Sequence, residues 1–214
     1  MNLNFDDFVE KLEQRLKLPL PGRDAQEKMA PYPVDENRFK ENLQKPAKPG
    51  GVMILLYPHE NDIYLPLMKR PTYNGAHSGQ VSFPGGKFEQ QDLDLNFTAL
   101  RETHEEIGVA PEEVSLIGKL SDLFIIASNF KVHPSVGFVP SRPQFIPDPL
   151  EVEEVLEVSL SHLYDLTQRG VEPMRFENYT IHSPYFDVQG HVVWGATAMM
   201  LSELLQVISE LEKA

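Results

Sequence analysis

Apolar residues recur at helical spacing near the start of the chain, which predicts an amphipathic helix that ends before Pro19. The residues on its apolar face are Phe5, Phe8, Val9, Leu12 and Leu16. Residues 19–49 are rich in proline and polar residues, so we expect an extended or partly ordered arm with a short helix near residues 36–43. Residues 1–50 are therefore predicted to form a helix and a proline-rich arm outside the main domain.

Strand-like patterns begin after residue 50. Residues 52–57 form a continuous apolar run of strand length, and residues 63–68 are its expected hairpin partner. Further strands are predicted at residues 114–120, 132–139, 153–158, 174–181 and 185–193, and helices at residues 98–107, 161–167 and 194–211. Because these elements interleave without regular alternation, residues 51–214 are predicted to form one α+β domain, with helices packed against a mixed sheet.

Composition narrows the class of protein. The chain has 214 residues, of which 41% are hydrophobic and 24% charged, and these values are typical of a globular domain with a buried core. No apolar run is long enough to span a bilayer, and the acidic start lacks the basic and apolar regions of a secretory signal. Since the chain has no cysteine, it can form no disulfide framework. We therefore expect a cytoplasmic protein without a membrane partner.

The net charge of -13 argues against nonspecific binding of nucleic acids, which requires clustered lysine and arginine. An acidic protein that binds a phosphorylated small molecule needs a local positive centre. A bound divalent cation would provide one.

The segment RETHEE, residues 101–106, concentrates carboxylates on one face of a predicted helix. With Glu102 at zero, Glu106 falls at roughly 40° and Glu105 at roughly -60° around the helix axis. Like charges at this spacing destabilise an isolated helix, whereas Mg²⁺ or Mn²⁺ would bind such oxygen ligands. Gly108 is expected to end the helix.

A solvated helical face is the alternative interpretation of these carboxylates, because most charge clusters are solvent-exposed. The sequence FPGG at residues 83–86 favours a metal site instead. Its glycines allow the backbone to approach the helix closely, so that a carbonyl oxygen could join the ligands.

Residues 86–109 resemble the Nudix box, G-x5-E-x7-REUxEExGU, in which U is a bulky aliphatic residue. Two departures are visible. The spacing from Gly86 to Arg101 is one residue longer than in the pattern, so the first acidic position falls on Asp92 or Leu93, and Thr103 occupies the first U position. The resemblance implies a Nudix-type α/β/α sandwich and metal-dependent hydrolysis of a diphosphate linkage.

The sequence GQVSFPGG, residues 79–86, resembles a signature of the coenzyme A diphosphatase subfamily. This resemblance implies cleavage of coenzyme A or its thioesters into 3′,5′-ADP and a 4′-phosphopantetheine product. However, many relatives have an arginine where this chain has Gly75, which weakens the assignment. ADP-ribose, NADH or a nucleoside triphosphate are the alternative substrates, and a non-catalytic nucleotide-sensing module is a further alternative. A homodimer is a family-level expectation.

The Nudix resemblance implies a role for each matching residue. It assigns metal coordination to Glu102, Glu105, Glu106 and the carbonyl of Gly86, and orientation of the site to Arg101. The general base stays open, because the superfamily places it on the box helix or on later loops. Glu105 is our first choice.

Several residues near the expected site have competing interpretations. Glu151, Glu153 and Glu154 could supply a base from outside the box helix, or could be the solvated end of a strand. Three basic residues flank the box and are predicted to bind substrate phosphates, although each could be an ordinary surface charge. They are Lys69, Arg70 and Lys87.

Overall fold

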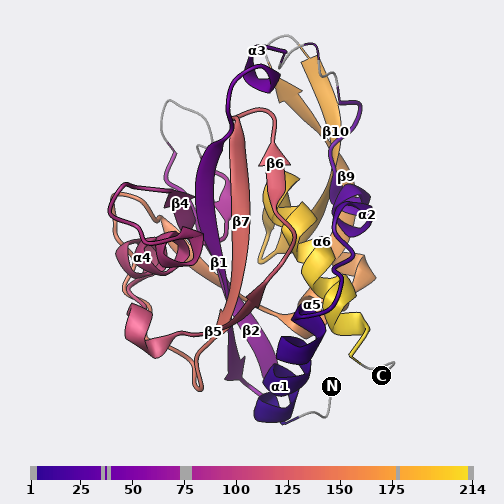
Figure 1. Cartoon of the computed structure of the whole chain (residues 1–214). Coiled ribbons are helices and arrows are strands. Elements are labelled where there is room, and N and C mark those ends of the chain that lie inside the picture. The colour runs from indigo at the N-terminus through magenta and orange to yellow at the C-terminus, as the bar shows by residue number, and fades with distance from the viewer. Residues whose placement is uncertain (1–3, 35–36, 38–39, 73–78, 177–178, 212–214) are drawn as a thin grey trace.

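The computed structural model describes residues 4–34, 37, 40–72, 79–176 and 179–211. A mixed sheet forms its centre (Figure 1). Its strands are β1 Lys48–His59, β2 Asp62–Lys69, β3 Val81–Ser82, β4 Gly85–Lys87, β5 Ser115–Lys119, β6 Leu123–Ile125, β7 Phe130–Phe138 and β8 Glu154–Ser159. The main order is β3-β2-β1-β7-β5, in which β1 and β7 are parallel and the other neighbours antiparallel. β4 pairs with β1, β6 with β7, and β8 with β2.

A second sheet has the order β11-β10-β9 and consists of β9 Arg169–Phe176, β10 Tyr179–Val188 and β11 His191–Trp194. The helices are α1 Phe5–Leu16, α2 Arg23–Gln26, α3 Lys40–Leu43, α4 Leu95–Ile107, α5 Leu160–Tyr164 and α6 Gly195–Ser209. Short 3₁₀ turns lie at Glu27–Met29, Pro111–Glu113 and Leu166–Gln168. None of the helices in the described ranges is long and apolar enough to cross a bilayer.

Strand β1 separates two hydrophobic cores, because successive side chains of a strand point to opposite faces. Ile54 and Leu56 pack in a core with α1 and α6, whereas Met53 and Leu55 pack in another with Ala99 of α4. All of these side chains are fully buried. Figure 1 shows α4 on one side of β1 and β7, and α6 on the other. The predicted α/β/α sandwich and α+β class are confirmed.

The N-terminal segment contributes to the same core. α1 has the predicted boundaries, and its Phe8 and Leu12 are fully buried. In the stretch expected to be an extended arm, α2 and the turn Glu27–Met29 pack against α6. Met29 is buried there. Of the short helix expected near residues 36–43, the described part is α3.

Two predicted strand boundaries were wrong. The strand expected at residues 174–181 is divided between β9, which ends at Phe176, and its antiparallel partner β10, which begins at Tyr179. The strand expected at residues 185–193 is interrupted by Gln189 and Gly190, whose φ angles of 55° and 84° form a tight turn between β10 and β11. Left-handed φ angles at two successive residues are typical of two-residue hairpin turns. The sequence did not predict this turn, because Gln-Gly is a weaker turn signal than Asn-Gly.

Candidate active site

Helix α4 presents the acidic segment, and local signals determine both of its ends. Asp94 caps the N-terminus by accepting a hydrogen bond from the backbone N–H of Phe97 at 2.8 Å. Gly108 ends the helix, as predicted, with a left-handed φ of 78° and a backbone hydrogen bond to the carbonyl of His104. The carboxylates of the last two turns therefore have fixed positions relative to the sheet.

Glu106 is the most deeply buried of the three glutamates, with 1% of its side chain exposed. Its Oε2 accepts a hydrogen bond from the backbone N–H of Gly85 at 2.7 Å, and its Oε1 accepts one from Nη2 of Arg70 at 3.0 Å. Burial raises the pKa of Glu106 to about 7, although Arg70 and the Gly85 N–H act in the opposite direction. For Glu106, the interpretation as a solvated helical face was wrong.

Glu102 and Glu105 are held by one guanidinium group. Nη1 of Arg101 donates to Oε1 of Glu102 at 2.9 Å and to Oε2 of Glu105 at 2.8 Å. The exposed fractions of the two glutamate side chains are 14% and 56%. Burial raises the pKa of Glu102, and the charge of Arg101 acts against this shift. The exposed fraction of the side chain therefore increases from Glu106 through Glu102 to Glu105.

Asp92 fixes the position of Arg101 from the loop before α4. Its Oδ1 accepts from Nε of Arg101 at 2.9 Å and its Oδ2 from Nη2 at 3.1 Å. Asp92 is buried and also accepts a hydrogen bond from the hydroxyl of Thr98. The neighbouring Leu93 is 86% exposed. Of the two candidates for the first acidic position, Asp92 is the residue that contacts the box arginine.

The glycine pair lies directly against the carboxylates. A Cβ atom at Gly86 would lie 2.3 Å from Oε1 of Glu102, so that any side chain would displace this carboxylate. The carbonyl oxygen of Gly85 lies 3.4 Å from Nη2 of Arg70, beside Glu106. Coordination by the carbonyl of Gly86 stays a prediction. Gly85, the other glycine of the predicted pair, places its carbonyl beside the buried glutamate.

The three predicted phosphate-binding residues lie in different surroundings. Arg70 reaches Glu106 and so contacts the carboxylate cluster directly. Lys69 pairs with Glu153 at 2.7 Å. Lys87 is exposed, and its backbone carbonyl accepts a hydrogen bond from Arg101. A role in substrate binding stays a prediction for all three.

Of Glu151, Glu153 and Glu154, Glu151 is the residue whose charge affects the carboxylate site. Its negative charge raises the pKa values of Glu102 and Glu106. The backbone leading to it is fastened to the end of α4, since Asp148 donates to the carbonyl of Glu106 at 3.0 Å. Glu154 instead lies 3.3 Å from the ring of His191. A pattern of adjacent acidic residues could not distinguish these orientations.

The described part of the chain holds no group of three histidine, aspartate or glutamate side chains that could bind a metal ion as they stand. Arg70 and Arg101 each engage these carboxylates. The donor set nevertheless fits a hard divalent cation, because three carboxylates and a carbonyl supply oxygen ligands on one side of α4. The raised pKa values of Glu102 and Glu106 indicate that the two arginines compensate their buried charge only in part. Gly75, the position at which many relatives of the coenzyme A subfamily have an arginine, lies outside the described residues.

A mixed sheet between helices, with an acidic helix beside a glycine pair, defines an α+β sandwich with a carboxylate site on one of its helices. A family model, the NUDIX domain, matches residues 47–179. Nudix hydrolase 15, mitochondrial, from Arabidopsis thaliana is 35% identical over 194 residues, which cover 86% of this chain and 65% of that protein. The chain thus spans slightly less than two thirds of that relative. It belongs to the Nudix family and carries a NUDIX domain.

Two further similarities agree with this family. An uncharacterized Nudix hydrolase, NudL, from Pectobacterium atrosepticum is 33% identical over 181 residues, which cover 81% of this chain and 92% of that protein. The crystal structure of a MutT/nudix family protein from Enterococcus faecalis has a TM-score of 0.54 and covers 92% of this chain and 77% of that chain. At 14% identity the last similarity shows the fold alone. Nudix hydrolases generally use divalent cations and act on small-molecule nucleotides.

Proposed function

We propose that the chain hydrolyses the diphosphate linkage of coenzyme A or its thioesters, giving 3′,5′-ADP and 4′-phosphopantetheine or its acylated form. The position of the GQVSFPGG segment is the observation that carries this proposal. Its middle residues, Val81 and Ser82, form β3 next to β2. Its last two residues begin β4, where the N–H of Gly85 donates to Glu106. The segment that resembles the subfamily signature is therefore built into the carboxylate site.

Mg²⁺ or Mn²⁺ would be held by Glu102, Glu105 and Glu106, with a carbonyl of the glycine pair as a further ligand. Such an ion, when bound, polarises a phosphoryl oxygen and lowers the pKa of a bound water. Cation binding at Glu106 requires Arg70 to move away from the carboxylate that it contacts in this structure, whereas Arg101 contacts one oxygen each of Glu102 and Glu105. Gly86 is the carbonyl ligand implied by the resemblance, and Gly85, the other glycine of the pair, is a second candidate because it lies beside Arg70 and Glu106.

The remaining catalytic roles are proton transfer and orientation of the carboxylates. Glu105, the most exposed of the three, accepts the proton of the attacking water as its oxygen bonds to phosphorus and the P–O–P bridge breaks. Arg101, held by Asp92, orients Glu102 and Glu105. Glu151 is the alternative base, because its charge acts on the same site.

Substrate phosphates would be bound by Arg70, Lys69 and Lys87. Arg70 has a planar fork of donors that suits two phosphate oxygens, and it already lies at the carboxylate cluster. When Glu106 binds a cation, the guanidinium of Arg70 becomes available for the substrate. Lys69 and Lys87 add positive charge on β2 and β4, both of which pair with β1.

A substrate panel tests the proposal. Purified protein with Mg²⁺ or Mn²⁺ is incubated in H₂¹⁸O with coenzyme A, dephospho-coenzyme A, NADH or ADP-ribose, and the products are identified by mass spectrometry. We expect the highest kcat/KM for coenzyme A, with ¹⁸O in one of the two phosphate products. Faster turnover of another compound would replace coenzyme A as the substrate. No turnover of any compound would favour a nucleotide-sensing module.

The location and the assembly of the protein are part of the same proposal. We propose a cytoplasmic location, because a chain without cysteine can form no disulfide framework. We also expect a homodimer. Multi-angle light scattering gives the mass in solution directly, and a mass near 24.3 kDa, that of one chain, would contradict the dimer.

A further inference from the structure

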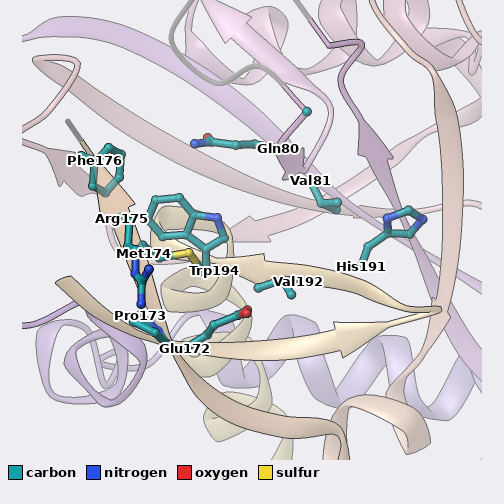
Figure 2. A pocket seen from close by; sticks show the side chains of 11 residues that line it. Gln80, Val81, Glu172, Pro173, Met174, Arg175, Phe176, His191, Val192 and Trp194 are labelled. Atoms are coloured by element: carbon teal, nitrogen blue, oxygen red, sulfur yellow. The ribbon is translucent and has the colours of Figure 1, made fainter. Parts of the chain in front are cut away.

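A cavity of about 440 Å³ lies between β3 and the second sheet (Figure 2). Its volume is in the range of small-molecule pockets, about 300 to 1,000 Å³. β3 supplies Val81, preceded by Gln80, β9 supplies Met174, Arg175 and Phe176, and β11 ends in Trp194. The carboxylate site described above contributes no residue to this wall.

Aromatic side chains form one part of the wall. The rings of Trp194 and Phe176 lie 6.5 Å apart at an interplanar angle of 57°, and Phe176 stacks on Tyr179 at 4.6 Å. The backbone of Trp194 is fixed, because it pairs with Tyr185 and immediately precedes α6. Trp194 and Phe176 are only partly buried, so the molecule offers a supported aromatic surface to a ligand.

Two polar side chains, Gln80 and Arg175, also line the cavity beside the aromatic rings. Figure 2 shows the amide of Gln80 across from the indole of Trp194, and Arg175 near Met174 on the strand below. An amide can both donate to and accept from the edge of a heterocycle, and a guanidinium can bind phosphate. Planar aromatic groups favour stacking on tryptophan, whereas a flexible aliphatic chain has no such preference. This combination fits a nucleobase that carries phosphate.

The cavity and the carboxylate site are adjacent. The backbone N–H of Arg70 donates to the carbonyl of Gln80 at 3.0 Å, while the side chain of Arg70 binds Glu106. One residue thus contacts both the cavity wall and the buried glutamate. Neighbouring strands lie about 4.8 Å apart, so β2 and β3 bring the two sites within reach of one nucleotide. The hydroxyl of Thr197 binds the carbonyl of Val81 and holds this edge against α6.

We propose that this cavity binds the nucleobase of the nucleotide substrate, which stacks on Trp194 while the diphosphate lies at the carboxylate helix. The inference rests on the proposed function, because it assumes that the substrate is a nucleotide. Beyond that function, the inference states that the nucleobase, which lies away from the reacting bond, is the part of the substrate recognised by the cavity. Specificity would then come in part from the second sheet, outside the residues that resemble the Nudix box.

The chain contains a single tryptophan, so tryptophan emission reports on the surroundings of Trp194. The experiment titrates the full-length protein with adenosine 5′-monophosphate in EDTA and follows tryptophan emission. We expect saturable quenching. Ribose 5-phosphate, which has the same phosphate but no base, should cause none. Phe176→Ala and Gln80→Ala should each raise the apparent Kd for the nucleotide at least about fivefold. Val171→Ala, exposed on β9 outside the cavity wall, is the matched control and should bind like wild type.

Several outcomes would overturn the inference: no saturable quenching by the nucleotide, equal quenching by ribose 5-phosphate, or wild-type affinity in both variants. Quenching by 4′-phosphopantetheine without quenching by the nucleotide would overturn it as well. Because the titration needs no turnover, its result is separate from the substrate panel. A protein that hydrolyses coenzyme A without binding the nucleotide here would keep the proposed function and lose this inference.

Discussion

The guanidinium group of Arg101 and the carboxylate of Asp92 form a two-point contact, with N–O distances of 2.9 and 3.1 Å. The hydrogen bonds from Arg101 hold the pKa of Asp92 well below its usual range, so both groups remain charged. Because two donors of Arg101 are used on Asp92, Nη1 is directed toward Glu102 and Glu105. The orientation of the carboxylate helix thus depends on a residue in the preceding loop.

Replacing Asp92 by alanine removes this contact and leaves a mostly buried guanidinium with fewer partners. We expect Asp92→Ala to lower the free energy of unfolding by about 3 kcal/mol, and to lower kcat as well. Urea unfolding and turnover measure the two effects. Glu89→Ala, an exposed position in the same loop, is the control. An unchanged unfolding midpoint in Asp92→Ala would show that the pair does not hold the loop.

Glu105→Gln tests the general base. The side chain is largely exposed, so the fold should be unaffected, while kcat should fall at least about 100-fold because the proton acceptor is lost. Turnover and thermal unfolding are measured together, with Glu112→Gln as an exposed acidic control. A loss of kcat in Glu151→Gln, with activity retained in Glu105→Gln, would move the base to Glu151.

The buried Glu106 predicts a pH-dependent stability of the metal-free protein. Its pKa is raised from 4.5 to about 7, so between these values the folded state keeps a proton that the unfolded state has lost. The free energy of unfolding should therefore fall as pH rises from about 4.5 to 7, by on the order of 3 kcal/mol from this residue. Glu102, whose pKa is also raised, adds a fall in the same direction.

Urea unfolding in EDTA at several pH values measures this dependence. Glu106→Gln, which does not titrate, should reduce the slope and should also abolish metal-dependent turnover. Glu112→Gln, an exposed position outside the carboxylate cluster, is the control for the removal of one carboxylate. Identical slopes in Glu106→Gln and wild type would contradict the raised pKa.

Glu203 of α6 joins the N-terminal segment to the sheet. It is fully buried and accepts hydrogen bonds from the backbone N–H groups of Gly22 and Ser121 and from the side chain of Gln26. Glu203→Ala removes the acceptor of both backbone N–H groups, while Gln26 keeps its contact with the carbonyl of Ser121, so the free energy of unfolding should fall by about 3 kcal/mol. Gln206→Ala removes an exposed contact between the same regions and should change it by less than about 0.5 kcal/mol. Equal stabilities of the two variants would refute this role.

Periodicity was sufficient to predict the central elements. The apolar run at residues 52–57 lies inside β1, and the carboxylate spacing correctly placed Glu102, Glu105 and Glu106 on one helix that ends at Gly108. Their burial could not be predicted, because it depends on β4 and Arg70 and not on α4 alone. The sequence therefore predicted that the three glutamates lie on one helix, but not that Glu106 would be buried in the interior.

Contacts between distant segments account for most of the remaining differences. The stretch of residues 19–49 was expected to be an arm because proline and polar residues dominate it, but Gln26 and Met29 are buried against parts of the chain more than 90 residues away. The cavity beside Trp194 likewise combines residues near positions 80, 175 and 194. No local pattern reports on such a combination.

The fully buried Ile54 and Leu56 have a consequence for how this domain can change through evolution. Their face of β1 is covered by α1 and α6, both of which lie outside residues 47–179, the part that the family model matches. A gene fragment limited to the matched part would encode a sheet with one apolar face open to water. The two ends must therefore be inherited together with the carboxylate helix α4. A recombination event that exchanges one of them singly requires the core to repack.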